Sequence, residues 1–201
     1  KAPAGTIHGG IECINGQWYV FYHRCTNNTD YSRQACAETI TILPDGTIPQ
    51  VEITTQGISG KPMDARGSLA AAYLCNLMTG KRIKLGNGKP QTLPRVDEQG
   101  DTIYVADIAD GTRMGYKYFD FNGVTGLVIT YRGDGTGTMS VCFDEKQSAV
   151  RTVKICPQSE WTEAVIKLQR KDGIAPLYLD YQGKGKIDVV SIRFLTGEEQ
   201  E

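Results

Sequence analysis

The fold class is decided near the N-terminus, by the stretch Ile11-Glu12-Cys13-Ile14-Asn15-Gly16-Gln17-Trp18-Tyr19-Val20-Phe21-Tyr22. Two runs rich in β-branched and aromatic side chains flank Asn15-Gly16, the dipeptide that best supports a type I′ turn. This arrangement is typical of an antiparallel hairpin. Because the same strand and turn signals recur along the whole chain and helix signals are almost absent, we predict an all-β fold.

A second pair of strands follows the first hairpin. It comprises Ala37–Leu43 and Thr47–Thr54, joined through the turn signal Pro44-Asp45-Gly46. Residues 6–55 are therefore predicted to form four antiparallel strands. A sheet of this size corresponds to one blade of a β-propeller. No second copy of the pattern occurs in the chain. An isolated sheet of this size leaves apolar surface exposed, so it needs neighbours or must pack on the residues that follow.

The C-terminal half shows the strand spacing of a β-sandwich, and we predict a jelly roll there. The expected strands are Ile103–Ile108, Gly115–Phe121, Leu127–Arg132, Thr138–Phe143, Val150–Ile155, Thr162–Leu168, Pro176–Tyr181 and Ile187–Leu195. In the last of these, alternation predicts that Val190, Ile192 and Phe194 face the core. From its length, the region 95–197 is expected to fold alone.

The region between these parts, residues 57–99, is rich in Gly and Pro and is interpreted as a connector. Within it, Ser68–Leu77 fits either a short helix or a buried strand, because periodicity does not separate the two at this length. The expected organisation is a blade over 1–56, the connector over 57–99 and a sandwich over 100–197.

Composition excludes several classes of function. The 201 residues carry 22 Lys+Arg against 23 Asp+Glu, a net charge of −1 that gives no bias toward nucleic acid. No apolar run approaches the roughly 18 residues of a membrane helix. The six cysteines include no Cys-x-x-Cys pair that would indicate zinc. Cys25 and Cys36 flank a polar segment, and either close a hairpin disulfide in an oxidising compartment or remain reduced.

The residues alone favour binding over catalysis, because the chain has only two histidines and neither a Gly-x-Ser-x-Gly elbow nor a P-loop. His8 precedes Gly9-Gly10, where small residues leave room for a ligand or an ion beside the imidazole. The alternative for His8 is an ordinary hydrogen-bonded side chain. Arg24 and Arg33 place two cations at one edge of the predicted sheet, either for a ligand or for surface ion pairs.

Several motifs carry a resemblance to a known family. In the first half these are Ile7-His8-Gly9-Gly10-Ile11, Asn15 to Arg24, Ser32 to Glu38 and Leu43 to Glu52. They resemble the last blade of a family 43 glycoside hydrolase, a five-bladed propeller, and fit best to the xylosidase and arabinofuranosidase group. In the second half, Lys117-Tyr118-Phe119-Asp120-Phe121, Tyr131-Arg132-Gly133, Trp161 and Leu177 to Gly185 are similar to family 6 carbohydrate-binding modules.

The resemblance implies supporting roles in the first half. The catalytic carboxylates of such enzymes lie on blades that this sequence does not contain, so we expect no hydrolysis from this chain alone. His8 resembles the histidine near the propeller axis that helps to hold a metal ion. Arg33 resembles an arginine that reaches the substrate pocket. The implied partners are the missing blades of a parent enzyme and a plant polysaccharide of the arabinoxylan or xylan type.

For the sandwich, the resemblance implies carbohydrate binding by aromatic rings, because the apolar face of a sugar packs on a flat, rigid ring. Tyr116 and Trp161 are the candidates by motif position. Lys186 stands where many such modules have an asparagine. The resemblance also implies calcium as a structural cofactor, although the Glu-x-Glu that often marks this site is not evident near Val96–Asp101.

Three functions remain open at this point. The chain is expected to be the C-terminal region of a glycoside hydrolase, comprising the final blade and the sandwich. The alternative of another class is a stand-alone carbohydrate-binding protein without hydrolase activity. In a third possibility the sandwich chiefly braces the propeller, with Trp161 buried between domains.

Overall fold

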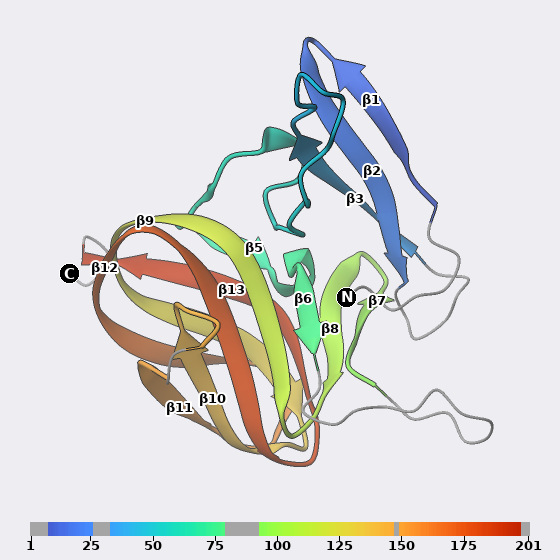
Figure 1. The fold of residues 1–201 in the computed structure, drawn as a ribbon. Helices are drawn as coiled ribbons and strands as arrows, with labels where there is room; N and C mark the ends of the chain where they lie inside the picture. The colour runs from blue at the N-terminus through green and yellow to red at the C-terminus, as the bar shows by residue number, and fades with distance from the viewer. Residues whose placement is uncertain (1–7, 26–32, 79–92, 147–148, 198–201) are drawn as a thin grey trace.

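The computed structural model describes residues 8–25, 33–78, 93–146 and 149–197, with the backbone alone for residues 24, 25, 33 and 34. Its strands form a small N-terminal sheet and a larger sandwich (Figure 1). Among the described residues the only helical elements are two 3-10 turns, η1 (Gly57–Ser59) and η2 (Ala71–Tyr73). No described helix has the length and apolar character needed to span a membrane. The predicted all-β fold is confirmed.

The N-terminal sheet contains β1 (Gly10–Ile14), β2 (Gln17–Cys25) and β3 (Arg33–Ile40), in that order. The predicted hairpin is present, with Ile14 opposite Gln17. Both turn residues have positive φ, 50° at Asn15 and 82° at Gly16, as a type I′ turn requires. The turn residues that made this hairpin predictable therefore also set its register.

The predicted fourth strand, Thr47–Thr54, is not formed, and this expectation is wrong. The turn before it is present, since the Leu43 amide donates to the Thr47 carbonyl at 2.9 Å. Beyond the turn the chain runs beside β3 without a ladder, and is joined to it through the side chain of Glu38. Pro49 has no N–H to donate, which weakens any backbone pairing at this position.

The sandwich is built around two long strands, β9 (Thr112–Gly133) and β12 (Gln158–Lys184), which pair with each other through both layers. The other strands are β7 (Arg95–Gln99), β8 (Thr102–Ile108), β10 (Thr136–Cys142), β11 (Arg151–Ile155) and β13 (Ile187–Thr196). The first layer has the order β11-β10-β12-β9, using the C-terminal half of β12 and the N-terminal half of β9. The second layer has the order β12-β9-β13-β8-β7, using the other halves.

Four of the eight predicted sandwich strands merge in pairs, so that each of the two long strands contains two of them. The gaps predicted between them are bends within a strand. The backbone has positive φ at Gly123 (70°) and Gly173 (81°), and the register shifts on either side of Lys171. Glycine allows the backbone to turn from one layer to the other without ending the pairing.

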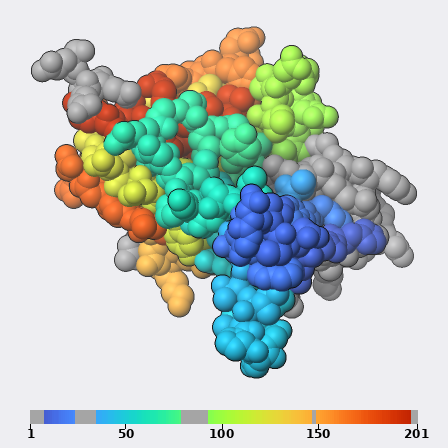
Figure 2. All heavy atoms as spheres, turned by 90° about the horizontal axis from the view of Figure 1, so that it is seen from above, coloured from blue at the N-terminus to red at the C-terminus, as the bar shows by residue number. Residues whose placement is uncertain are grey.

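The predicted connector supplies strands to the sandwich. These are β4 (Met63–Asp64) and β6 (Asn76–Met78), which pair with β9, and β5 (Ser68–Ala70), which pairs with β13. Both alternatives for Ser68–Leu77 hold in part, because two short strands flank the single turn η2. The segment lies between the N-terminal sheet and the rest of the sandwich in the view from above (Figure 2). Its buried side chains are Ala65, Leu69, Ala71, Ala72 and Leu74.

The last strand departs from simple alternation. Ile187 and Val189 are buried in its first half, and Ile192 and Phe194 in its second half. The ladder with β9 pairs Val189 with Tyr131 and Ser191 with Thr130, so Val190 is an extra residue. The bulge shifts the inward face by one position, and the predicted core face is therefore correct only beyond it.

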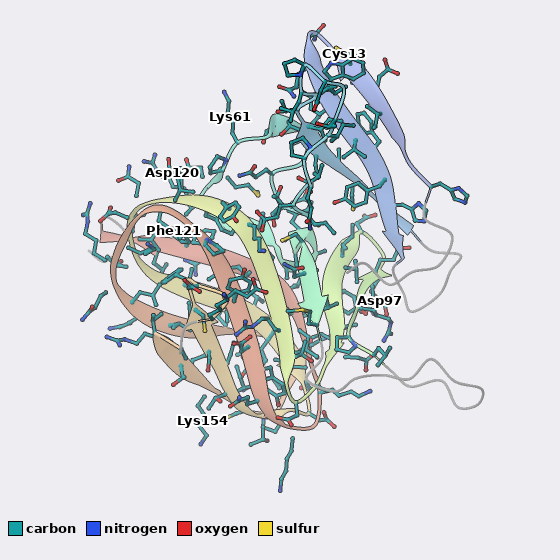
Figure 3. All side chains as sticks on the ribbon, viewed as in Figure 1. Cys13, Lys61, Asp97, Asp120, Phe121 and Lys154 are labelled. Atoms are coloured by element: carbon teal, nitrogen blue, oxygen red, sulfur yellow. The ribbon has the colours of Figure 1, made fainter. Side chains whose placement is uncertain are left out.

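The core between the layers is aromatic. Phe119 lies 5.0 Å from Phe194 and 5.8 Å from Phe121, measured between ring centroids, in edge-on or tilted arrangements. Such contacts add about 0.5–1.5 kcal/mol per pair beyond the burial of area. Phe121, labelled in Figure 3, is 1% exposed.

A short segment, residues 52–55, fastens the N-terminal sheet to the sandwich, and we call it the junction strap. On the sheet side, the buried Glu38 carboxylate accepts hydrogen bonds from the Thr54 amide and hydroxyl, both at 2.7 Å, and from the Tyr22 hydroxyl at 3.1 Å. On the sandwich side, the Lys117 amide donates to the Thr55 hydroxyl oxygen at 3.0 Å. The two sheets are therefore joined by directional polar contacts.

Glu52 completes the strap. It accepts hydrogen bonds from the Lys117 ammonium and the Tyr118 hydroxyl, each at 2.8 Å. Burial by itself raises the pKa of Glu52, but these two donors outweigh it and the net pKa is lowered. The strap therefore carries its negative charge at neutral pH.

Candidate functional site

A concentrated group of aromatic and charged side chains lies on the outer face of the second layer. Trp161 of β12 lies at its centre and is partly buried. Tyr104 of β8 meets the indole edge-on, with ring centroids 5.7 Å apart and planes at 71°. Arg132 of β9 lies over the indole, with its guanidinium carbon 4.3 Å from the ring centroid. We refer to these three residues as the Trp161 cluster.

Arg132 connects the cluster to two further strands. Its Nε donates to Asp188 Oδ2 of β13 at 3.2 Å, and its Nη2 donates to Gln99 Oε1 of β7 at 3.1 Å. The guanidinium also lies 5.2 Å from the centre of the Tyr104 ring. One side chain of the central strand thus contacts residues of four other strands in the same layer.

A second charged group adjoins the cluster, with Asp107 at its centre. The Asp107 carboxylate accepts from the Arg95 guanidinium and, at 3.0 Å, from the Lys186 ammonium. Its backbone amide donates to Asp188 at 3.1 Å. Asp107 has a φ of 56°, which is uncommon for a residue other than glycine but is tolerated best by Asp and Asn. Lys186, which stands where many family 6 modules have an asparagine, is held in this ion-pair group.

The ion pairs make Asp107 a determinant of acid stability. Burial by itself raises the pKa of Asp107, but the hydrogen bonds and positive charges of Lys186 and Arg95 outweigh it, so the net pKa is lowered. A lowered folded-state pKa adds stability that is fully present above the unfolded value of about 3.9 and is lost as the pH falls through the folded value.

We expect the free energy of unfolding to decrease below about pH 4, and Asp107→Asn to flatten this decrease. At pH 7 the variant should lose about 1.5–3 kcal/mol, the range for hydrogen bonds to a charged group. Urea unfolding between pH 2 and pH 7 measures both effects. Asp120→Asn, at an exposed position of β9, is the matched control. An unchanged pH profile in Asp107→Asn would contradict the assignment.

Tyr116, expected to bind sugar, lies in the core. Its side chain has 0% exposure, and its hydroxyl donates to the Ala71 carbonyl at 2.9 Å. A ring without exposed surface offers no face for a sugar to stack on. The expectation for Tyr116 is therefore wrong, because the motif position did not reveal that η2 covers this part of β9.

His8, expected to bind substrate and a metal ion, is exposed at the start of β1. Its ring lies 5.9 Å from that of His23 on β2, and the two line a shallow hollow with Phe21. His23 Nε2 is a buried nitrogen without a hydrogen-bond partner in the described part of the chain. No group of three His, Cys, Asp or Glu side chains suited to a metal occurs among the described residues.

Arg33, expected in the substrate pocket, begins β3 opposite Cys25, and its side chain lies outside the described residues.

The register of β2 and β3 also excludes the disulfide considered between Cys25 and Cys36. Cys36 pairs with Tyr22, so Cys25 and Cys36 stand three positions apart along the ladder. At about 3.4 Å per residue this separation exceeds the reach of a Cys25–Cys36 disulfide.

Sequence reasoning identified Trp161 but missed Tyr104 and Arg132. Tyr104 belongs to a run, Ile103–Ile108, that predicts a strand without indicating which face the ring takes. Tyr131-Arg132-Gly133 was singled out as a motif, yet nothing in it indicates that the guanidinium covers a ring from another strand. These contacts depend on strand order, which alternation does not encode.

Comparison with known proteins finds relatives that span both parts of the chain, while no family model matches. A xylosidase/arabinosidase of Thermoclostridium stercorarium is 35% identical over 201 residues, covering 96% of this chain and 42% of the relative. The chain therefore spans less than half the length of that protein.

Two solved structures share the fold. A glycoside hydrolase family 43 arabinoxylan arabinofuranohydrolase from Bacillus subtilis, in complex with cellotetraose, matches with a TM-score of 0.60 and 15% identity, covering 96% of this chain and 42% of that one. A family 6 carbohydrate-binding module from Clostridium cellulolyticum, in complex with xylose, matches with a TM-score of 0.55 and 15% identity, covering 66% of this chain and 99% of the module. The predicted resemblance to family 43 enzymes and family 6 modules is confirmed, by sequence for the xylosidase/arabinosidase and by fold for the two structures.

Proposed function

We propose that this chain is the C-terminal region of a glycoside hydrolase acting on arabinoxylan or xylan, with a sandwich that binds carbohydrate and braces the catalytic part. One observation carries the proposal: 35% identity to a xylosidase/arabinosidase extends over 96% of the chain, including both the N-terminal sheet and the sandwich. Because the identity extends over both the N-terminal sheet and the sandwich, it supports the same order of these two parts in the two proteins.

The N-terminal sheet is proposed to pack against other propeller blades of the parent enzyme. Ile11, Ile14 and Trp18 are 47%, 45% and 38% exposed in the first hairpin. Large apolar side chains gathered on a small sheet are typical of a surface that another part of the protein covers. In this proposal His8 and Arg33 lie on the side of the sheet that faces the propeller axis, as supporting residues for substrate, and His8 for a metal ion.

The sandwich is proposed to bind carbohydrate at the Trp161 cluster. Trp161 supplies an aromatic ring close to polar groups, the combination that sugar sites use. The solved family 6 module has xylose as its ligand. Calcium is proposed to bind away from the Trp161 cluster, because the adjoining carboxylates of Asp107 and Asp188 are already paired with Arg and Lys.

The test separates binding from catalysis. We expect no hydrolysis of nitrophenyl arabinofuranoside or nitrophenyl xyloside by this chain alone, because the resemblance places the two catalytic carboxyl groups on blades that this sequence does not contain. In affinity gel electrophoresis we expect retardation by soluble arabinoxylan, and Trp161→Ala should weaken it by about tenfold, as for a binding hot spot.

Two results would redirect the proposal. If Trp161→Ala destabilised the fold by about 3–5 kcal/mol and left retardation unchanged, the sandwich would be purely structural. Measurable hydrolysis by the chain alone would show that its own carboxylates are catalytic. Tyr73→Ala, at an exposed aromatic residue outside the cluster, is the matched control for binding.

A further inference from the structure

We propose that Arg132 is a gate on the Trp161 ring, which a carbohydrate must displace before it can stack there. The inference rests on the proposed carbohydrate function and adds how that site is controlled. It follows from three observations: the position of the Arg132 guanidinium over the ring, the lengths of its hydrogen bonds, and the donors that its carboxylate neighbours keep when it moves away.

The guanidinium occupies the position that a sugar would need. Its carbon lies 4.3 Å from the centre of the Trp161 ring, well inside the 6 Å range of a cation–π contact. A pyranose that stacks on an indole needs the same layer of space directly over the ring. The two cannot occupy one ring face together, and Tyr104 closes another side by its edge-on contact.

Arg132 is held more loosely than the comparable arginine of the sandwich. Its bonds to Asp188 and Gln99 measure 3.2 and 3.1 Å, whereas Arg113 makes two bonds of 2.7 Å to Asp180. Charge-assisted bonds are usually 2.7–2.9 Å long, so the contacts of Arg132 are weak for their type. Its side chain is 26% exposed, which gives the guanidinium a path to solvent.

The departure of Arg132 leaves no carboxylate without a donor. Asp188 keeps the hydrogen bond from the Asp107 amide at 3.1 Å, and Asp107 keeps both of its cations. An open state is therefore accessible without breaking the adjoining ion-pair group. A ligand that binds only the open state has its apparent affinity reduced by the fraction of open molecules.

The test uses a Trp18→Phe background, in which Trp161 is the sole tryptophan. Arg132→Ala opens the gate, and Arg132→Gln keeps a donor for Asp188 but lacks the planar cation. Arg193→Ala is the control, because Arg193 pairs with Glu163 in the same layer and lies over no aromatic ring of the described residues. Thermal unfolding by circular dichroism checks that each variant is folded.

Two measurements follow. We expect acrylamide quenching of Trp161 fluorescence to increase several-fold in Arg132→Ala and to stay unchanged in Arg193→Ala. By calorimetry, Arg132→Ala should bind xylohexaose about 2-fold to 30-fold more tightly, the range that corresponds to a cation–π contact of roughly 0.5 to 2 kcal/mol at 1.4 kcal/mol per factor of ten. Arg132→Gln should lie between Arg132→Ala and the parent.

The possible failures are distinguishable. If the parent binds xylohexaose and Arg132→Ala binds it equally or more weakly, the gate is overturned while carbohydrate binding stands. If neither the parent nor any folded variant binds xylohexaose or arabinoxylan, the proposed function of the sandwich fails and the gate with it. Unchanged quenching in a folded Arg132→Ala overturns the gate whatever the ligand does.

Discussion

A chain reduced to residues 95–197 will not fold into the sandwich, although its length alone suggests an independent domain. It lacks β4, β5 and β6, and with them the buried side chains Leu69 and Leu74. Removing one buried leucine side chain typically destabilises by 2–5 kcal/mol, and whole domains are stable by only about 5–15 kcal/mol. The Tyr116 hydroxyl also loses its acceptor, the Ala71 carbonyl. We expect no cooperative thermal transition and no near-ultraviolet circular dichroism.

The matched control is a chain of residues 57–197, which keeps the three short strands and lacks only the N-terminal sheet and its strap. We expect this longer chain to unfold cooperatively. The interpretation would be wrong if the 95–197 chain unfolded cooperatively within a few degrees of the 57–197 chain. The comparison decides where a binding module of this type has to begin.

Replacing Glu38 will loosen the attachment of the N-terminal sheet. Glu38 is 5% exposed and accepts three hydrogen bonds, two from Thr54 and one from Tyr22. Glu38→Ala removes all three of these hydrogen bonds, and we expect a loss of about 3 kcal/mol in urea unfolding. Glu38→Gln keeps the shape but not the charge and should lose about half as much.

Hydrogen exchange gives this prediction a local readout, because the Thr54 amide should exchange much faster in Glu38→Ala. Glu12→Ala is the control, since Glu12 is an exposed carboxylate of the same sheet and should shift stability by less than about 0.5 kcal/mol. Equal protection of the Thr54 amide in both variants would show that Glu38 does not hold the junction strap.

Local signals predicted local structure well. The Asn15-Gly16 turn and the strands at Ile103–Ile108 and Val150–Ile155 all correspond to observed elements, because each depends on a few neighbouring residues. Position 190 shows the limit of this reasoning. One extra residue reversed the inward face of the last strand, and no local pattern announces such a bulge.

Long-range placement was harder to predict. Gly123 and Gly173 lie in the gaps left between predicted strands, whereas they bend two strands that continue from one layer to the other. The segment around Leu69 was interpreted as a connector because the region is rich in Gly and Pro, whereas it supplies strands of two or three residues. In both cases the deciding interactions come from residues far away in sequence.

The candidate site shows the same division. Trp161 was identified from its motif, whereas Tyr116 was misplaced because its cover, Ala71 in η2, lies 45 residues earlier. Arg132 acquires its position from Asp188 and Gln99 on other strands. A motif therefore indicated which residue to examine, and the fold determined whether its ring is accessible.

The continuous pairing of β9 with β12 has a consequence for ligand-induced stabilisation. Because the same two strands form part of both layers, we expect the two layers to unfold together. A ligand that binds only the folded state stabilises everything that unfolds with its site. A carbohydrate bound at Trp161 in the second layer should therefore also protect β10 and β11 in the first, although Trp161 belongs to neither strand.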